Sequence, residues 1–285
     1  MTVREEKIMD KEYLARLFSL ADKVAVVTGG GGVLCSSMCR AMAQAGARVM
    51  VLDLLEAAAQ KVAGEITAAG GVAIPWQADA LNKKSLEKAC EGVLQKFGRV
   101  DILINGAGGN KPQATTSPDL SFFDLPQDAF QWVFDLNFTT ALLASQVFGK
   151  AMSRQKNGVI LNISSMNYFR PLTRVPAYSA AKAAVSNFTQ WLAVHLSQNY
   201  SPKIRVNAIA PGFFLTEQNR FLLTEKETGN LTPRGQAIIE HTPMNRFGKA
   251  EDRTGAVLWL LSPAAQFVHG TVIAIDGGFS AYSGV

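Results

Sequence analysis

The chain has 285 residues, 48% of them hydrophobic and 18% charged, so it can bury a large core and does not have the composition of a disordered protein. Lysine and arginine exceed aspartate and glutamate by only 28 to 23, and the surplus is spread along the chain, which argues against nucleic acid as a partner. The N-terminus carries no export signal, no apolar run is long enough to span a membrane, and the three cysteines lack zinc-ligand spacing. We therefore expect a cytoplasmic protein that binds neither membranes nor metals.

From Lys23 onward, short β-branched runs alternate with stretches of helical periodicity, which is typical of parallel strands joined by crossover helices. Several runs are continuously apolar, as expected for strands covered on both faces. This pattern predicts an α/β fold: one Rossmann-like, doubly wound parallel sheet of about seven strands with helices on both faces. The expected strands are Val24–Thr28, Arg48–Leu52, Val72–Trp76, Val100–Asn105, Gly158–Ser164, Lys203–Ala208 and Thr271–Ile275.

Two segments interrupt this alternation. Residues 1–20 precede the first strand and contain apolar side chains at the spacing of a short amphipathic helix, so we interpret them as an N-terminal extension. Residues 213–247 are longer than a simple crossover, and long connections of this kind are usually lids or binding loops. We expect residues 21–285 to form a single dinucleotide-binding catalytic domain with a lid insertion at about 213–247.

The first expected strand runs through a glycine-rich turn, Gly29 to Gly32, into a helix, which is where α/β folds bind a pyrophosphate. The alternative for this turn alone is a flexible loop without function. Asp53 ends the second strand, where a carboxylate accepts hydrogen bonds from the adenosine ribose hydroxyls and repels a 2′-phosphate. The sequence therefore predicts NAD (NADH) as cofactor, and Asp53 disfavours NADP.

Tyr178 and Lys182 are four residues apart, so on a helix they lie on one face. A phenol is a poor acid–base catalyst at neutral pH, but a nearby ammonium favours the phenolate and is expected to lower its pKa. Ser165, at the end of the fifth strand, is placed to hold the substrate oxygen by a hydrogen bond. A Tyr–Lys pair at this spacing is common by chance, so its interpretation depends on the surrounding motifs.

Those motifs resemble the short-chain dehydrogenase/reductase family from about Phe18 to the C-terminus. They occur in the family's order: Thr28-Gly29, Asp53, Asp79, Asn105-Gly106-Ala107-Gly108, Asn137, Ser165, Tyr178-x-x-x-Lys182, Pro211-Gly212 and Asp276-Gly277-Gly278. The resemblance implies an NAD-dependent oxidoreductase that moves a hydride between cofactor and a carbonyl carbon, acting on a CH–OH group. It also implies a homotetramer, because members of the family usually assemble through the helices after strands four and five.

Carried over to this sequence, the resemblance implies four catalytic residues. Tyr178 would be the general acid/base, Lys182 would lower its pKa and bind the nicotinamide ribose, and Ser165 would orient the substrate oxygen. The backbone of Asn137 would hold a water in the proton relay. The implied cofactor-binding residues are Gly29, Gly31, Gly32, Val33, Leu34, Asp53, Asp79, Ala80, Asn105, Ala107, Gly108, Tyr178, Lys182, Pro211, Gly212 and Thr216.

The chain departs from the family's glycine pattern, because Val33 and Cys35 stand where its second and third glycines belong. Gly106 likewise replaces the second asparagine of the N-N-A-G motif. We expect NAD binding to survive, since a cysteine is small enough to pack near a strand. The run Gly29–Cys35, with Phe169–Leu172 and the terminal Phe279–Val285, resembles a subgroup assigned as D-mannonate oxidoreductases, also called fructuronate reductases.

A sugar acid presents a carboxylate and several hydroxyls, so its pocket should offer one cation and several amide or hydroxyl groups. The candidates are Asn110, Asn167, Arg170 and Arg220, with Arg170 the first choice for the carboxylate and Arg220 the second. We therefore expect interconversion of D-mannonate and D-fructuronate with NAD(H). The alternatives are a gluconate 5-dehydrogenase, a 3-oxoacyl-acyl-carrier reductase, or a non-catalytic NAD-binding protein, against which the intact catalytic residues argue.

Overall fold

A seven-stranded parallel sheet, in the order β3-β2-β1-β4-β5-β6-β7, forms the centre of the molecule. The computed structural model describes residues 10–215 and 220–284. The strands are β1 (Val24–Thr28), β2 (Arg48–Asp53), β3 (Val72–Gln77), β4 (Ile102–Asn105), β5 (Gly158–Ile163), β6 (Ile204–Pro211) and β7 (Val272–Ile275). Each expected strand is present, the largest difference being β6, which continues to Pro211. The doubly wound, Rossmann-like fold is confirmed.

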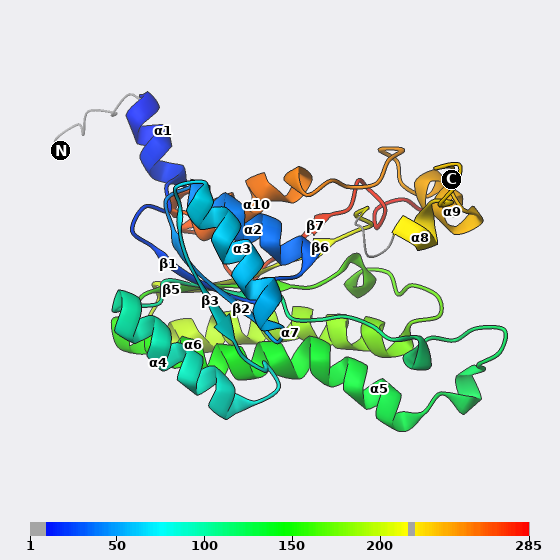
Figure 1. Ribbon diagram of the computed structural model, residues 1–285, viewed down its shortest axis with the longest axis horizontal. Helices are drawn as coiled ribbons and strands as arrows, with labels where there is room; N and C mark the ends of the chain where they lie inside the picture. Colours follow the sequence, from blue (N-terminus) through cyan, green and yellow to red (C-terminus); the bar gives the residue numbers. More distant parts are fainter. Residues whose placement is uncertain (1–9, 216–219, 285) are drawn as a thin grey trace, which may run out of the picture.

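Helices cover both faces of this sheet (Figure 1). One face carries α2 (Val33–Gln44), α3 (Glu56–Ala68) and α10 (Glu251–Leu261), and the other carries α4 (Lys83–Phe97), α6 (Thr140–Gln155) and α7 (Pro176–Asn199). In β1, Val24 and Val26 belong to the core under α4, α6 and α7, whereas Ala25 and Val27 belong to the core under α2, α3 and α10. The continuous apolar runs are thus explained by burial on both faces.

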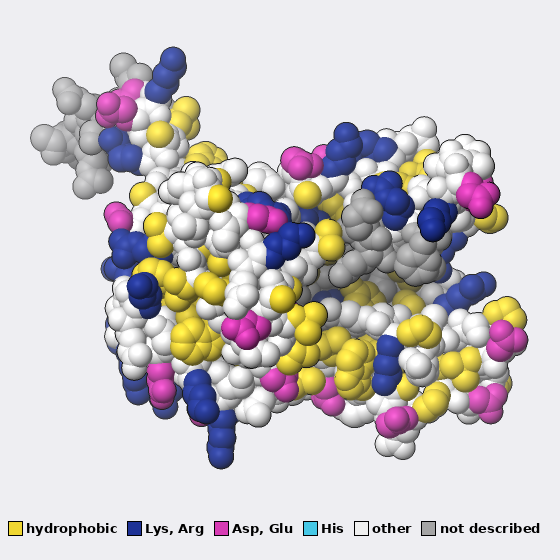
Figure 2. Space-filling model, viewed as in Figure 1, with side chains coloured by type: hydrophobic (Ala, Val, Ile, Leu, Met, Phe, Trp, Pro, Cys, Tyr) yellow, Lys and Arg dark blue, Asp and Glu magenta, His cyan; other side chains and the backbone are white. Residues whose placement is uncertain are grey.

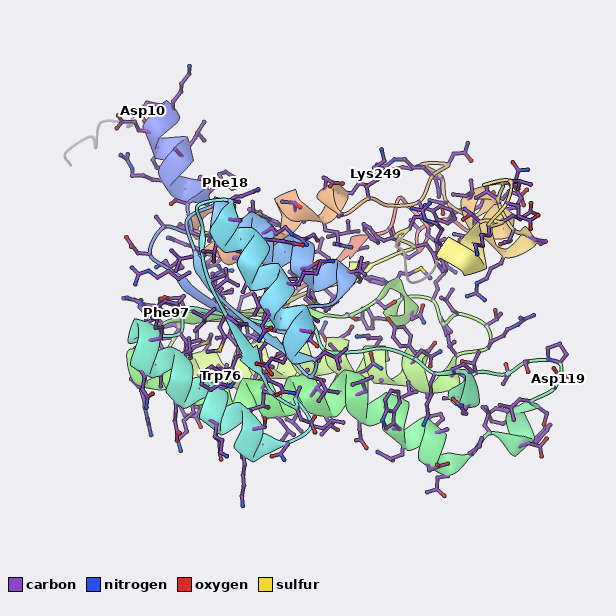
Figure 3. The ribbon with its side chains drawn as sticks, in the orientation of Figure 1. Asp10, Phe18, Trp76, Phe97, Asp119 and Lys249 are labelled. Carbon is purple, nitrogen blue, oxygen red and sulfur yellow. The ribbon has the colours of Figure 1, made fainter. Side chains whose placement is uncertain are left out.

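The N-terminal extension, from residue 10 onward, contains the short helix α1 (Lys11–Phe18). The Asp10 carboxylate caps it by accepting a hydrogen bond from the Tyr13 amide at 2.7 Å. The helix has no buried residue and stands away from the sheet, with Asp10 at its far end and Phe18 at the body (Figure 3). Within the part of the chain that is described, no helix is long and apolar enough to cross a membrane.

Segments at the carboxyl ends of the strands surround the site. Between β4 and α6 lie α5 (Gln127–Phe134) and a π-helical turn, Asp135–Thr139, and the segment 213–247, the expected lid, contains α8 (Arg220–Leu223) and α9 (Pro233–Glu240). Short 3-10 turns complete the chain at Pro112–Ala114, Phe122–Asp124, Met166–Tyr168 and Pro263–Ala265. Figure 2 shows a hollow between the side of the molecule that carries α8 and α9 and the side formed by α5 and its neighbouring loops.

Candidate active site

The strand order reverses between β1 and β4, and ligands of open α/β sheets bind at the carboxyl ends of strands at such a point. A cleft of about 350 Å³ lies there. Its predicted lining residues are Gly29, Gly32, Val33, Leu34, Asp53, Asp79, Ala80, Ala107 and Gly108. The sequence reasoning missed Cys35, Leu52, Leu54, Leu81, Leu136 and Thr140, which also line it. Leu54 directly follows β2, a position that could have indicated it, whereas Leu136 and Thr140 belong to the π-helical turn and the start of α6, for which the sequence offers no signal.

The N-terminus of α2 opens onto this cleft without a capping side chain. Its N-cap residue is Gly32, and its first turn contains no acidic residue. The first helical hydrogen bond runs from the Ser36 amide to the Gly32 carbonyl at 2.8 Å, so the amides of residues 33–35 precede the helical ladder. These donors and the positive end of the helix dipole fit a pyrophosphate.

Gly29 shapes the turn before this helix. It has a positive φ of 64°, and a Cβ there would lie 3.0 Å from the Ala107 backbone. A side chain at this position would therefore be strained and would close the approach between the glycine turn and the end of β4. The turn forms a backbone cradle of the kind that a dinucleotide requires.

Asp53, at the end of β2, lines the cleft and is held there by two hydrogen bonds. Its Oδ2 accepts a hydrogen bond from the Gly31 amide at 3.0 Å, and its Oδ1 accepts one from the Leu55 amide at 3.0 Å. A carboxylate has further lone pairs for ribose hydroxyls. Gly31 itself does not line the cleft, and a Cβ there would lie 2.6 Å from the Ala58 Cβ, so its part is to hold Asp53. None of the described residues that line this cleft is a lysine or arginine.

Cys35 and Gly106 are two departures from the family's pattern, and they pack directly against each other. A Cβ on Gly106 would lie 2.2 Å from the Cys35 Sγ, and that sulfur is 3.8 Å from the Gly106 carbonyl oxygen. The cysteine side chain therefore occupies space that any side chain at 106 would need. Burial raises the pKa of the Cys35 thiol to about 11, so it stays neutral at physiological pH.

The catalytic candidates from β5 and α7 lie together. Ser165 is 7% exposed, and its side chain is hydrogen-bonded to Tyr178. The Lys182 Nζ lies 5.5 Å from the centroid of the Tyr178 ring and donates to the Ile163 carbonyl at 2.9 Å. Ser164, by contrast, has its hydroxyl 2.6 Å from that of Ser186, so its side chain faces the helix α7.

Asn137 is 1% exposed and lies within the π-helical turn that joins α5 to α6. Its side-chain amide donates to the carbonyls of Gly109 at 2.6 Å and Val133 at 2.8 Å, so it fastens this turn to the loop after β4. A Cβ on Gly108 would lie 2.7 Å from the Asn137 Oδ1 and 3.4 Å from the Lys182 Nζ. Asn137 therefore lies near Lys182, and π-helical turns are frequent at functional sites.

Burial changes the pKa values of both Tyr178 and Lys182. The pKa of Tyr178 is raised because burial penalises the phenolate, and the hydrogen bond from Ser165 opposes this only in part. The pKa of Lys182 is lowered to about 8, again by burial. The expected lowering of the Tyr178 pKa by Lys182 is therefore wrong for this structure. The ammonium lies over the ring and donates to a backbone carbonyl instead of the phenol oxygen.

Asn105, Pro211 and Gly212, which were also predicted to bind the cofactor, have roles within the fold itself. The Asn105 side chain points away from the cleft and donates to Ser145 at 2.9 Å and Asn162 at 2.7 Å in a buried polar network. Pro211 ends β6, and the Gly212 amide donates to the Ile275 carbonyl at 3.0 Å. Thr216 lies outside the described residues.

The four substrate candidates are placed differently from one another. Asn167 is 3% exposed and its amide donates to the Ser179 hydroxyl at 3.2 Å, so it fastens the loop after β5 to α7 and presents little surface to a substrate. Asn110 is exposed and donates to Thr115 at 3.0 Å. Arg170 is exposed and its Nε donates to the Ser280 carbonyl at 2.8 Å. Arg220 is the exposed first residue of α8.

The C-terminal tail, which sequence reasoning did not assign to the site, contacts both the segment 213–247 and the loop after β5. The Phe279 ring contacts Phe213, with centroids 5.2 Å apart, and His241, at 4.6 Å. Both Asp276 carboxylate oxygens accept tail amides, from Gly278 at 3.0 Å and Ser280 at 2.9 Å. The turn Asp276-Gly277-Gly278 was the available signal, since it redirects the chain at the end of β7.

A family model described as short chain dehydrogenase matches residues 23–227. The chain belongs to the short-chain dehydrogenase family and is an oxidoreductase. It is 51% identical over 276 residues to the uncharacterized oxidoreductase UxuB of Bacillus subtilis, covering 94% of this chain and 98% of that protein.

Two solved structures are also similar. One is a provisionally assigned D-mannonate oxidoreductase from Haemophilus influenza, crystallised with bound NAD, with 46% identity and a TM-score of 0.89 over 95% of this chain and 100% of that one. The other is a provisionally assigned NAD(P)-dependent gluconate 5-dehydrogenase from Beutenbergia cavernae with bound NADP. It has 32% identity and a TM-score of 0.82 over 93% and 100% of the two chains.

Proposed function

We propose that the protein interconverts D-mannonate and D-fructuronate, with NAD(H) as the hydride carrier. The observation that carries this proposal is the near full-length similarity, at 46% identity, to the Haemophilus protein provisionally assigned as a D-mannonate oxidoreductase. The exposed Arg170 on the loop after Ser165 supports it, because the carboxylate of a sugar acid needs a cation as its partner in the substrate pocket.

NAD is the proposed cofactor, in preference to NADP. The fixed Asp53 carboxylate is suited to two ribose hydroxyls and repels a 2′-phosphate. The absence of lysine and arginine among the described lining residues of the cleft leaves a 2′-phosphate without a cation there. Initial rates with NAD and NADP at equal concentrations test this, and equal kcat/KM values would contradict it.

The bound cofactor supplies or accepts the hydride at the carbon that carries the reacting oxygen. Ser165 holds this oxygen by a hydrogen bond, and Tyr178 donates a proton to it during reduction or takes one during oxidation. Because burial raises the pKa of Tyr178, its phenol is protonated at neutral pH and is ready to donate. We assign Lys182 to the nicotinamide ribose, and the Asn137 backbone to a water that leads protons to and from the site.

Arg170 is proposed to bind the substrate carboxylate through its Nη atoms. Its Nε is held by the Ser280 carbonyl, and this contact limits the orientations of the guanidinium plane. Arg220, on the lid, is the second proposed cation, and Asn110 a proposed partner for substrate hydroxyls. Asn167 is assigned to positioning the loop of Ser165, since its own amide is engaged by Ser179.

The decisive experiment is a panel of initial rates. D-mannonate, D-gluconate and D-mannitol are oxidised with NAD, and D-fructuronate and a 3-oxoacyl thioester are reduced with NADH. The proposal expects the highest kcat/KM for the D-mannonate/D-fructuronate pair and a much lower value for mannitol, which lacks the carboxylate. Activity confined to the acyl thioester, or equal activity with mannitol, would refute it.

The second candidate is gluconate 5-dehydrogenase activity, favoured by the similarity to the Beutenbergia structure. It predicts that D-gluconate is the best substrate in the panel. A non-catalytic NAD-binding protein is the third possibility, and it predicts NADH binding without turnover in both the natural protein and Tyr178→Phe.

We also propose a homotetramer that assembles through α6 and α7. The outer surface of α7 carries Trp191 and Val194, which are 56% and 55% exposed. Trp191 stacks on Phe188 and His195, and these rings line a groove of about 630 Å³ with residues of α6. Light scattering after size exclusion tests this assignment, and Trp191→Asp is expected to yield smaller species.

A further inference from the structure

Arg253, on α10, is a fully buried arginine beside the cofactor cleft. Its side chain is 1% exposed and crosses to the first turn of α2. There its Nη2 donates to the Leu34 carbonyl at 3.3 Å and to the Ser37 hydroxyl at 2.9 Å. The charge therefore lies against the helix whose free amides open onto the cleft.

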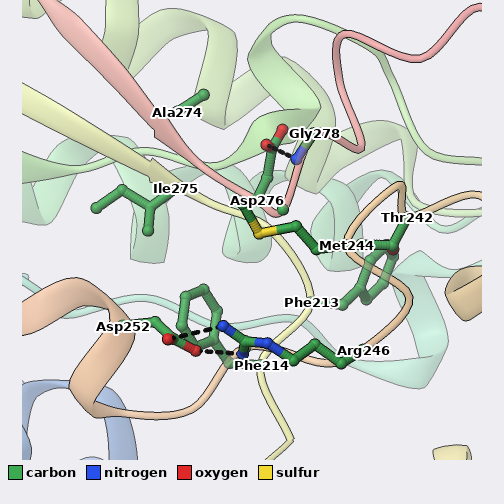
Figure 4. Close-up of a pocket in the computed structure, with 12 residues that line it drawn as sticks. Phe213, Phe214, Thr242, Met244, Arg246, Asp252, Ala274, Ile275, Asp276 and Gly278 are labelled. Atoms are coloured by element: carbon green, nitrogen blue, oxygen red, sulfur yellow. Dashed lines mark hydrogen bonds and ion pairs between the residues drawn. The ribbon is translucent and has the colours of Figure 1, made fainter.

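The charge of Arg253 has no anionic partner among the described residues. Its Nε and Nη1 are buried and make no hydrogen bond to any residue that the structure describes, and its guanidinium carbon lies 4.7 Å from the centroid of the Phe214 ring. The neighbouring carboxylate, Asp252, is engaged by both Nη atoms of Arg246, at 2.6 and 2.9 Å (Figure 4). Burial lowers the pKa of Arg253, although a guanidinium remains protonated at neutral pH.

This position is unfavourable for an isolated cation. The N-terminus of α2 is the positive end of its dipole, and a buried charge without a partner has lost its hydration. The repulsion from the helix dipole and the cost of the lost hydration both diminish when an anion binds at the same end of α2. The uncapped amides of residues 33–35 provide the place for one, and a dinucleotide brings a pyrophosphate with two negative charges.

We propose that Arg253 is a positioning residue for the cofactor pyrophosphate: its buried charge at the first turn of α2 strengthens anion binding there. The electrostatic field of the Arg253 guanidinium adds to that of the α2 dipole. This matters in a chain where Val33 and Cys35 replace two glycines of the phosphate turn. The proposal depends on NAD binding and is independent of the sugar-acid substrate. The alternative is a purely structural role, in which Arg253 only holds α10 against α2.

The test compares ligands with and without phosphates. Arg253→Gln removes the charge and keeps an amide that reaches toward the Leu34 carbonyl and the Ser37 hydroxyl. We expect it to raise the Kd values of ADP and NADH roughly tenfold, equivalent to about 1.4 kcal/mol, and to change the Kd of adenosine less than twofold. Calorimetric titration at low ionic strength measures all three without turnover.

Arg205 provides a matched control. It is also buried, at 8% exposure, and donates to the carbonyls of Ser262 and Val268 at the far end of the sheet. Arg205→Gln is expected to lower stability and leave the ratio of ADP to adenosine affinity unchanged. A purely structural role of Arg253 predicts that Arg253→Gln also leaves the ratio of ADP to adenosine affinity unchanged.

Equal losses for ADP and adenosine, or an unchanged ADP affinity, would overturn the proposal. If Arg253→Gln does not fold, Arg253→Lys decides, because it keeps the charge and changes the shape. An ADP-to-adenosine affinity ratio within twofold of the natural protein supports the role of the charge. A ratio lowered tenfold in Arg253→Lys contradicts it.

Discussion

The cofactor end and the substrate end of the active site are built in different ways. At the cofactor end, Asp53 and the glycine turn are held by backbone hydrogen bonds within the first two βαβ units. At the substrate end, Arg170 contacts Ser280, and Phe213 contacts Phe279, across more than 60 residues of chain. A dinucleotide keeps its shape across a family, so local backbone geometry suffices to bind it. A substrate pocket must differ between enzymes, and the contacts at the proposed substrate end come from distant loops and the C-terminal tail.

Tyr178→Phe should have the largest effect, and it separates chemistry from binding. Removing the phenol oxygen abolishes proton transfer, so kcat should fall about 100- to 10,000-fold. The Kd of NADH should remain within about twofold, because Tyr178 does not line the adenosine cleft. Stopped-flow turnover and fluorescence titration give the two quantities. A large loss of NADH affinity would show that the two ends are not independent.

Lys182 links the two ends, and its buried charge should appear in the pH dependence of stability. Its pKa is about 8 in the folded protein and 10.5 ordinarily, so between these values Lys182 holds its proton only in the unfolded chain, and its own contribution to the free energy of unfolding rises with pH, whereas the buried thiols of Cys35 and Cys90, with pKa values raised to about 11, contribute in the opposite direction above pH 9. The rise should reach about 3 kcal/mol. It should be missing in Lys182→Met, and urea titrations from pH 7 to 10.5 measure it. Parallel pH profiles for the two proteins would contradict the lowered pKa.

Arg170→Leu should affect the substrate end alone. Loss of a charge-assisted hydrogen bond costs about 2 kcal/mol, so KM for an acidic sugar should rise roughly 30-fold. KM for an uncharged polyol should change little, and KM for NAD should not change. Steady-state kinetics with both substrates tests this. An equal rise for both substrates means that the contact with Ser280 shapes the pocket and that Arg170 does not bind the carboxylate.

Gly106→Ala should have the smallest effect, confined to the cofactor end. The new Cβ would lie 2.2 Å from the Cys35 Sγ and 2.8 Å from the Thr28 carbonyl oxygen, so overpacking should destabilise the fold by about 1 to 2 kcal/mol. Adding Cys35→Gly should recover part of this, because the contact with Thr28 remains. Thermal melts of the single and double variants measure the coupling. Full additivity of the two changes would show that Cys35 and Gly106 do not form one packing unit.

The features that the sequence predicted correctly lie mainly at the cofactor end, and those that it predicted less well lie mainly at the proposed substrate end. Strands and phosphate turn were predictable because continuous apolar runs, glycines and a strand-terminal acid act locally. Asn167 and Arg170 were harder, since the sequence shows a polar residue without showing whether another part of the chain already engages it. Asn167 proved to be buried against Ser179, and Arg170 to contact the tail.

The sequence by itself determined the α/β fold, the position of the cofactor turn and the Ser165, Tyr178 and Lys182 group, because periodicity and short-range spacing are properties of the chain. Only the tertiary structure decided the raised pKa of Tyr178, the pairing of Cys35 with Gly106 and the burial of Arg253. These depend on desolvation and on contacts between residues 71 to 219 positions apart. Desolvation and long-range contacts cannot be predicted from the spacing of residues along the chain, because both arise when separate elements pack together and exclude water.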